Sequence, residues 1–65
     1  MIYVVVLHSQ TFTRHVLYAG VEEMKAYNTA KDATLYHDVD FVEFQTWADG
    51  EFIEARRLYA KPQRD

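Results

Sequence analysis

Two runs of alternating apolar and polar residues lie on either side of Asp49-Gly50, in the C-terminal third of the sequence. A two-residue type I′ turn needs positive φ at both central positions, which glycine accepts freely and aspartate tolerates. The pattern therefore predicts a β-hairpin whose strands cover residues 39–48 and 51–59.

The turn also predicts the register of this hairpin, because it makes the numbers of every opposed pair sum to 99. Trp47 then opposes Phe52, and Glu43 opposes Arg56. Opposed pairs contribute roughly 0.2–1 kcal/mol each, and a slip of one residue would exchange the faces and lose both pairs. One face carries the pairs Trp47–Phe52, Gln45–Glu54, Glu43–Arg56 and Phe41–Leu58, and the other carries Thr46–Ile53, Phe44–Ala55, Val42–Arg57 and Asp40–Tyr59.

The N-terminal half opens with a nearly continuous apolar run at 2–8, which is typical of a strand covered on both faces or flanked on both edges. A turn at Ser9-Gln10 would return the chain as a second strand over 11–18. Residues 21–31 then predict a helix with Gly20 as its N-cap. Its apolar residues recur at spacings of three, which predicts one core-facing stripe. The members of this stripe are Val21, Met24, Tyr27 and Ala30.

The element order is thus ββαββ, which predicts an α+β fold. A helix that joins the second strand to the third must cross one face of the sheet, and the simplest right-handed arrangement places the third strand beside the first. We expect a single small domain over residues 1–60, with a four-stranded antiparallel sheet in the order 2-1-3-4 and one helix on one face. Two hairpins docked through a partner chain would use the same elements. The polar tail 61–65 is expected to be flexible.

Composition narrows the class of protein. The 65 residues include no cysteine, which excludes a disulfide framework and a thiolate zinc site. Ten acidic and seven basic residues give a formal net charge of −3. Arg56 and Arg57 would point to opposite faces of a strand, so they form no patch for phosphate, and nucleic-acid binding is disfavoured. The run 2–7 is too short for a signal peptide or a membrane span, and we expect a soluble, cytoplasmic protein.

No residue cluster predicts catalysis or metal binding. His8, His15 and His37 lack neighbouring metal-ligand spacings. A turn at 9–10 would set His15 opposite Val4 and His8 opposite Thr11, with both histidines on one face but two pairs apart. Many carboxylates are present, but a domain of this size has little room for the cleft that acid–base chemistry needs. We therefore expect no metal, no cofactor and no enzymatic activity.

The hairpin carries apolar side chains on both faces, which is the most informative feature of the sequence. The face with Val42, Phe44, Ile53 and Ala55 is the better candidate for the core. One helix covers one face, so the other face would remain exposed, and a contiguous aromatic patch marks an interaction site. The predicted partner-binding residues are Phe41, Glu43, Trp47, Phe52, Arg56 and Leu58. With the faces reversed, Val42, Phe44, Ile53 and Tyr59 would be exposed instead.

These features favour a small non-enzymatic protein-binding module that docks through a sheet face or edge. A small acidic domain without site chemistry fits the style of phage- or mobile-element-encoded inhibitors of a larger host protein. One rival is a homodimeric structural or regulatory subunit whose sheets pack face to face. A second rival is a single-stranded nucleic-acid binder with Arg14, Arg56 and Arg57 around an aromatic platform. Salt dependence would separate this rival from an apolar interface.

Overall fold

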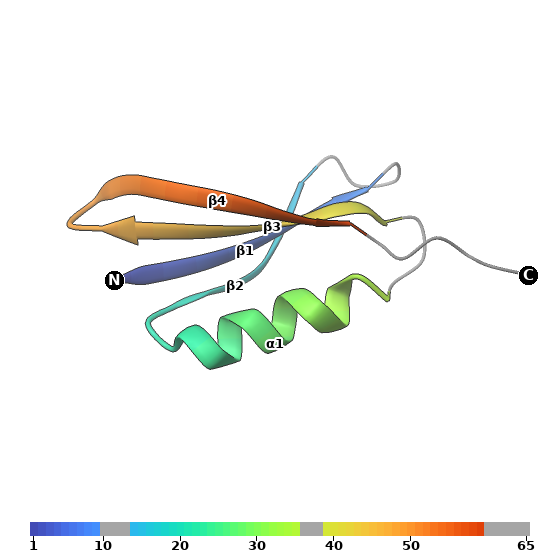
Figure 1. Cartoon of the computed structure of the whole chain (residues 1–65), viewed down its shortest axis with the longest axis horizontal. Coiled ribbons are helices and arrows are strands. Elements are labelled where there is room, and N and C mark those ends of the chain that lie inside the picture. The colour runs from blue at the N-terminus through green and yellow to red at the C-terminus, as the bar shows by residue number, and fades with distance from the viewer. Residues whose placement is uncertain (10–13, 36–38, 60–65) are drawn as a thin grey trace, which may run out of the picture.

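The computed structural model describes residues 1–9, 14–35 and 39–59 and shows the predicted ββαββ order. Figure 1 shows the sheet as one layer and the helix as a second layer beneath it. The elements are β1 (Ile2–Ser9), β2 (His15–Gly20), α1 (Glu23–Ala33), β3 (Val39–Ala48) and β4 (Glu51–Tyr59). The predicted turn at 9–10 lies partly outside the described residues, and the predicted tail at 61–65 lies wholly outside them.

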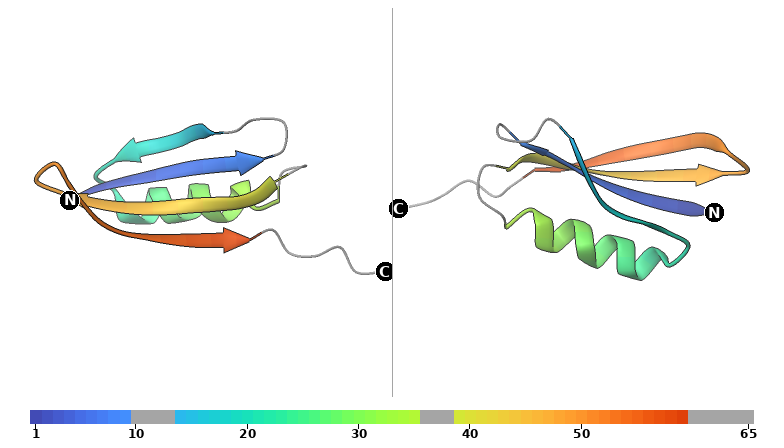
Figure 2. Two further views of the ribbon diagram at one scale, coloured as in Figure 1. Left: turned by 90° about the horizontal axis from the view of Figure 1, so that it is seen from above. Right: turned by 180° about the vertical axis from the view of Figure 1, so that it is seen from behind.

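The four strands form one antiparallel sheet in the order β2-β1-β3-β4, which confirms the predicted α+β topology. The two views of Figure 2 show the helix on a single side of this sheet. The most apolar strand, β1, occupies an interior position, and its residues Val5, Val6 and Leu7 are all buried. This placement agrees with the composition of β1, because an interior strand contacts neighbours on both sides.

The β3–β4 hairpin has the predicted turn. Asp49 has a φ of 53° and Gly50 a φ of 78°, and Ala48 pairs with Glu51 as a two-residue type I′ turn requires. The positive φ at Gly50 is the reason for a glycine there, because a β-branched residue would be strained in this conformation.

The predicted register beyond the turn is wrong. Trp47 pairs with Phe52 as predicted, but Thr46 then pairs with Glu54, so Ile53 is an extra residue in β4. This β-bulge makes every later pair sum to 100 instead of 99, because two residues of one strand oppose one residue of the other. The observed pairs that replace the predicted ones are Gln45–Ala55, Phe44–Arg56, Glu43–Arg57, Val42–Leu58 and Phe41–Tyr59.

The register of β1 with β2 also differs from the prediction. His15 pairs with Leu7, and Val4 pairs with Ala19. A second irregularity, between Val5 and Val6, shifts this register along the pair. The strand β2 ends at Gly20, two residues later than predicted, and part of the predicted strand, residues 11–13, lies outside the described residues.

The helix begins two residues later than predicted, with Glu22 instead of Gly20 as the N-cap. The hydroxyl oxygen of Tyr18 accepts a hydrogen bond from the Glu22 backbone N–H at 3.3 Å. A Cβ atom at Gly20 would lie 2.6 Å from this hydroxyl oxygen. Gly20 therefore makes room for the Tyr18 ring, which satisfies a donor at the start of the helix.

The predicted core stripe of the helix is wrong for three of its four members, and only Ala30 is buried as predicted. Val21, Met24 and Tyr27 are exposed, and Met24 retains 71% of its maximum solvent-accessible surface area. The buried stripe consists of alanines at 26, 30 and 33, all with 0% exposure. Alanine methyl groups let the helix backbone approach the sheet closely, and the bulk of the core comes from the sheet instead.

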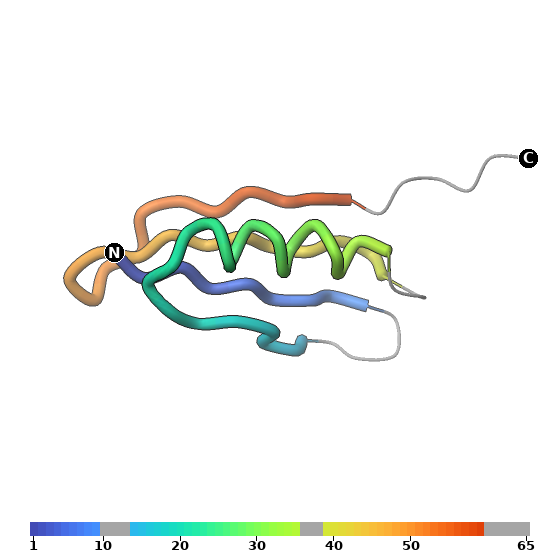
Figure 3. The backbone as a smooth tube through the Cα atoms, turned by 90° about the horizontal axis from the view of Figure 1, so that it is seen from below, coloured from blue at the N-terminus to red at the C-terminus, as the bar shows by residue number. Residues whose placement is uncertain are grey.

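The core lies between α1 and the sheet strands β1, β2 and β3. In Figure 3, seen from below, the helix runs along the middle of the sheet and β4 lies to one side of it. The buried cluster consists of Val5, Leu7, Ala26, Ala30, Ala33 and Val42, with Tyr3, Leu17, Tyr18, Val39, Phe44 and Leu58 packed around it.

Candidate interaction surface on the open face of the sheet

Strand alternation divides β1 and β3 between two faces of the sheet. Val5 pairs with Phe44 and Leu7 with Val42, and all four side chains pack in the cluster between the helix and the sheet. The alternate pairs face away from the helix, and no described element covers them (Figure 1). We call this surface the open face, and its β1–β3 pairs are Ile2–Trp47, Val4–Gln45, Val6–Glu43 and His8–Phe41.

At the turn end, the open face is aromatic. The rings of Trp47 and Phe52 lie edge to face, with centroids 5.5 Å apart and planes at 78°. This geometry is one that aromatic pairs prefer. Phe52 is 53% exposed, and Ile2, which pairs with Trp47 on the other side, is 42% exposed. Large apolar side chains therefore remain accessible at this end of the sheet.

A row of hydrogen bonds runs along β3 on the open face. Trp47 Nε1 donates to Gln45 Oε1 at 2.9 Å, and Gln45 Nε2 donates to Glu43 Oε1 at 2.9 Å. These residues are two positions apart, which places their side chains on one face of the strand. The row satisfies the polar atom of the indole and fixes the orientation of the Trp47 ring.

At the opposite end, Phe41 contacts both neighbouring strands. The imidazole of His8 stacks on its ring at 4.3 Å and 18°, and the guanidinium of Arg57 lies 4.6 Å from its centroid. The Tyr59 ring lies 5.9 Å away. The stacking of the Arg57 cation on the aromatic ring is a favourable cation–π arrangement. Phe41 is thus the centre of a packed cluster that includes β1, β3 and β4.

His8 and Glu43 lie close together on the open face, next to the Phe41 cluster. His8 Nε2 lies 3.6 Å from Glu43 Oε1, and both side chains are largely buried. This nitrogen is buried and makes no hydrogen bond within the described residues. His15 pairs with Leu7, whose side chain packs on the helix side of the sheet, so His15 lies on that side as well. The predicted placement of His8 and His15 on one face is therefore wrong.

Four of the six predicted partner-binding residues lie on the open face, namely Phe41, Glu43, Trp47 and Phe52. Because of the bulge, Arg56 pairs with Phe44 and Leu58 with Val42, which places both on the helix side. Arg57 and Tyr59 take their places in contact with Phe41. The same shift overturns Ile53 and Ala55 as core residues, because both are exposed.

The sequence predicts that one side of the apolar run 2–7 contributes to this surface, but it does not predict which side. The alternate residues Ile2, Val4, Val6 and His8 stand in the same run as the core residues. A continuous apolar run does not reveal which of its two faces a helix will cover, and only the pairing with β3 identifies it.

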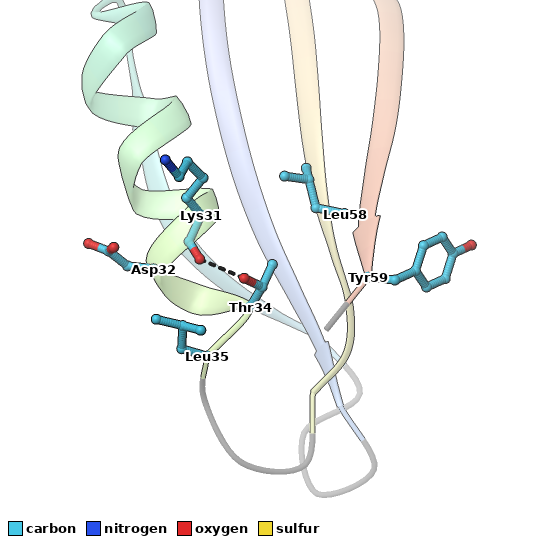
Figure 4. Close-up of a pocket in the computed structure, with 6 residues that line it drawn as sticks. All are labelled: Lys31, Asp32, Thr34, Leu35, Leu58 and Tyr59. Atoms are coloured by element: carbon cyan, nitrogen blue, oxygen red, sulfur yellow. Dashed lines mark hydrogen bonds between the residues drawn. The ribbon is translucent and has the colours of Figure 1, made fainter. Parts of the chain in front are cut away.

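A cleft of about 490 Å³ opens between the end of α1 and the end of β4. Figure 4 shows Leu58 pointing toward the helix and Tyr59 pointing away from it. The Thr34 hydroxyl donates to the Lys31 carbonyl oxygen at 2.6 Å, which closes the last turn of the helix beside the cleft. The lining residues are Lys31, Asp32, Thr34, Leu35, Leu58 and Tyr59. Among the described residues that line the cleft, Asp32 is the one carboxylate and Lys31 the one cation, and both are exposed.

Comparison of the chain with protein-family models, with curated proteins and with solved structures finds no match in any of the three. Within residues 1–9, 14–35 and 39–59, no three histidine, aspartate or glutamate side chains are grouped as a metal would require. No helix in the described part of the chain is long and apolar enough to cross a membrane.

Proposed function

We propose that this chain is a non-enzymatic protein-binding module that docks on another protein through the open face of its sheet. The supporting observation is the aromatic end of this face, where Phe52 and Ile2 are exposed beside a Trp47 ring held by a hydrogen bond to Gln45. Tryptophan is among the residues that contribute most to protein interfaces. A ring already held in one orientation loses little side-chain freedom on binding, which favours affinity.

The charges of the open face support a protein partner over a nucleic acid. Glu43 lies at the centre of the face, and Arg57 stacks on Phe41. Arg56 lies on the helix side, so the two neighbouring arginines form no common patch. Phosphate binding needs several clustered cations, and its affinity falls steeply with salt. An apolar and aromatic face with one acidic centre instead suits an apolar protein surface that carries a donor for Glu43.

The proposal extends to inhibition of a larger protein. The described residues form one sheet with one helix, and the open face of this sheet is held in place by the packed core behind it. A rigid face of this kind acts by occupying a surface on its partner. The partner would then lose access to whatever that surface normally binds.

Capture from a lysate, followed by titration of the captured protein, tests the open face. Trp47→Ala and Phe52→Ala should each weaken binding by about 2 kcal/mol, or roughly 30-fold, because they remove hot-spot aromatics. Met24→Ala is the matched control, since Met24 is an exposed apolar residue on the opposite layer of the molecule. Its affinity should equal that of the wild-type chain.

Three results would contradict the proposal. The first is equal affinity for Phe52→Ala and the wild-type chain, which would place the binding surface elsewhere. The second is unfolding of Trp47→Ala, which would assign the indole to the core. The third is preferential capture of single-stranded nucleic acid with a steep salt dependence, which would favour a stacking platform.

A further inference from the structure

The strand β4 is an edge of the sheet, and nearly all of it is exposed. It covers nine residues, and Leu58 is its single member that is not exposed. The helix packs on β1, β2 and β3, so its layer does not cover β4 (Figure 3). One side of an edge strand presents unpaired backbone N–H and C=O groups, which are a template for pairing with another chain.

Charged side chains on an edge strand usually prevent such pairing, but those on β4 are complementary to their own copy. Glu54 and Arg56 lie on the same side of the strand, with their charged groups 4.0 Å apart. Ala55 lies between them in sequence and points to the other side. Along the strand, the negative Glu54 comes before the positive Arg56. In a second strand that runs in the opposite direction, the positive residue comes first. Two copies in antiparallel orientation therefore present opposite charges to each other.

The charges also select one register of self-pairing. Directly opposed residues of two antiparallel strands share a face, so the symmetric registers that set these charged residues opposite each other are centred on Glu54, Ala55 or Arg56. Centring on Glu54 opposes two carboxylates, and centring on Arg56 opposes two guanidinium groups. Centring on Ala55 opposes Glu54 to Arg56 twice. Opposite charges in this position stabilise a strand pair, and like charges destabilise it.

We propose that two copies of this chain pair through their β4 edges, antiparallel, with Ala55 on the two-fold axis. The two sheets then form one continuous eight-stranded sheet. Each Glu54 contacts Arg56 of its own chain and Arg56 of the second copy, so the four side chains alternate in sign around a square. The two-fold axis is perpendicular to the sheet, and both helices therefore lie on the same side.

This arrangement leaves the open face accessible and joins it to the open face of the second copy. Edge pairing over a few residues buries little area, and interfaces below about 1,200 Å² are typically weak and transient. The association should therefore depend on concentration and weaken with added salt, because the charged pairs are exposed.

Charge reversal at the two positions tests the pairing by sedimentation of the full chain over a concentration series. Glu54→Arg opposes arginines at both contacts, and Arg56→Glu opposes glutamates at both. Each single substitution should raise the dimer dissociation constant at least tenfold, which corresponds to about 1.4 kcal/mol. The double variant Glu54→Arg/Arg56→Glu restores opposite charges and should dimerise like the wild-type chain. Both side chains are exposed, so the variants should fold, and circular dichroism checks this.

Mixing the two single variants provides the sharpest control. One chain then carries two arginines and the other two glutamates, so a heterodimer should form while each variant alone stays monomeric. A wild-type chain that remains monomeric up to about 1 mM would overturn the proposal. A dimer that is unaffected by the single substitutions, or that the double variant does not restore, would overturn it equally.

Discussion

The alanine stripe of α1 gives a sharp test of how the helix lies on the sheet. Ala30 is fully buried between Ala26 and Ala33, against the side chains of β1 and β3. Replacement by leucine inserts three further carbon atoms into a closed contact. Such overpacking typically costs about 1–3 kcal/mol. Met24 is exposed on the outer surface of the same helix, so Met24→Ala should change the free energy of unfolding by less than about 0.5 kcal/mol.

These changes are large relative to the stability of so short a chain. At about 0.05–0.15 kcal/mol per residue, this domain is expected to have an unfolding free energy of roughly 3–10 kcal/mol. A loss of 1 kcal/mol lowers the melting temperature of a domain of this size by about 4–8 °C. Ala30→Leu should therefore melt about 4–24 °C lower, and thermal and urea unfolding followed by circular dichroism would measure the difference.

Asn28→Leu is the matched control, because it adds a leucine to the exposed surface of the same helix. Leucine has a higher helix propensity than asparagine, so this variant should be as stable as the wild-type chain or slightly more stable. The reasoning would be refuted if Ala30→Leu were neutral and Met24→Ala lost about 2–5 kcal/mol, the loss typical of a buried methionine. That result would mean that the helix is rotated onto the stripe of Val21, Met24 and Tyr27.

Two further predictions concern the hairpin turn and the histidines. Gly50→Val forces a β-branched residue to a φ of 78° and should lower the free energy of unfolding by more than about 1 kcal/mol, measured by urea unfolding; an unchanged midpoint would contradict the type I′ turn. Excess zinc or a chelator should leave the melting temperature unchanged, because His8 and His15 lie on opposite faces of the sheet and a folded-state metal site would stabilise by mass action; a rise of several degrees would reveal a site.

The fold could be predicted from local chemistry, but the register of the hairpin could not. Asp49-Gly50 predicts its own turn, since the conformation depends on two residues alone. The bulge at Ile53 depends on which register gives the more favourable interaction energy, summed over all opposed side chains of the two strands. Both registers place an arginine opposite Glu43, Arg56 in one and Arg57 in the other, so the charge pair could not distinguish them. The observed register gains an apolar pair, Val42 with Leu58, on the side of the sheet that faces the helix.

The orientation of the helix could not be predicted, because two stripes compete in its sequence. Val21, Met24 and Tyr27 are larger than the alanines and dominate a count of apolar residues. Which stripe is buried depends on the space that the sheet leaves, and the sheet supplies the large side chains Tyr3, Phe44 and Leu58. Small residues on the helix then allow closer packing. This choice depends on volumes contributed by residues far away in the sequence.

The bulge connects the two proposed surfaces. Phe52, Glu54 and Arg56 occupy alternate positions, and in a regular strand all three would lie on one face. The extra residue, Ile53, leaves Phe52 beside Trp47 on the open face and moves the two charged residues to the helix side. The open face thereby keeps its aromatic end free of the Glu54–Arg56 pair. On the helix side, that pair lies on an edge strand that the helix does not cover, where a second copy can reach it.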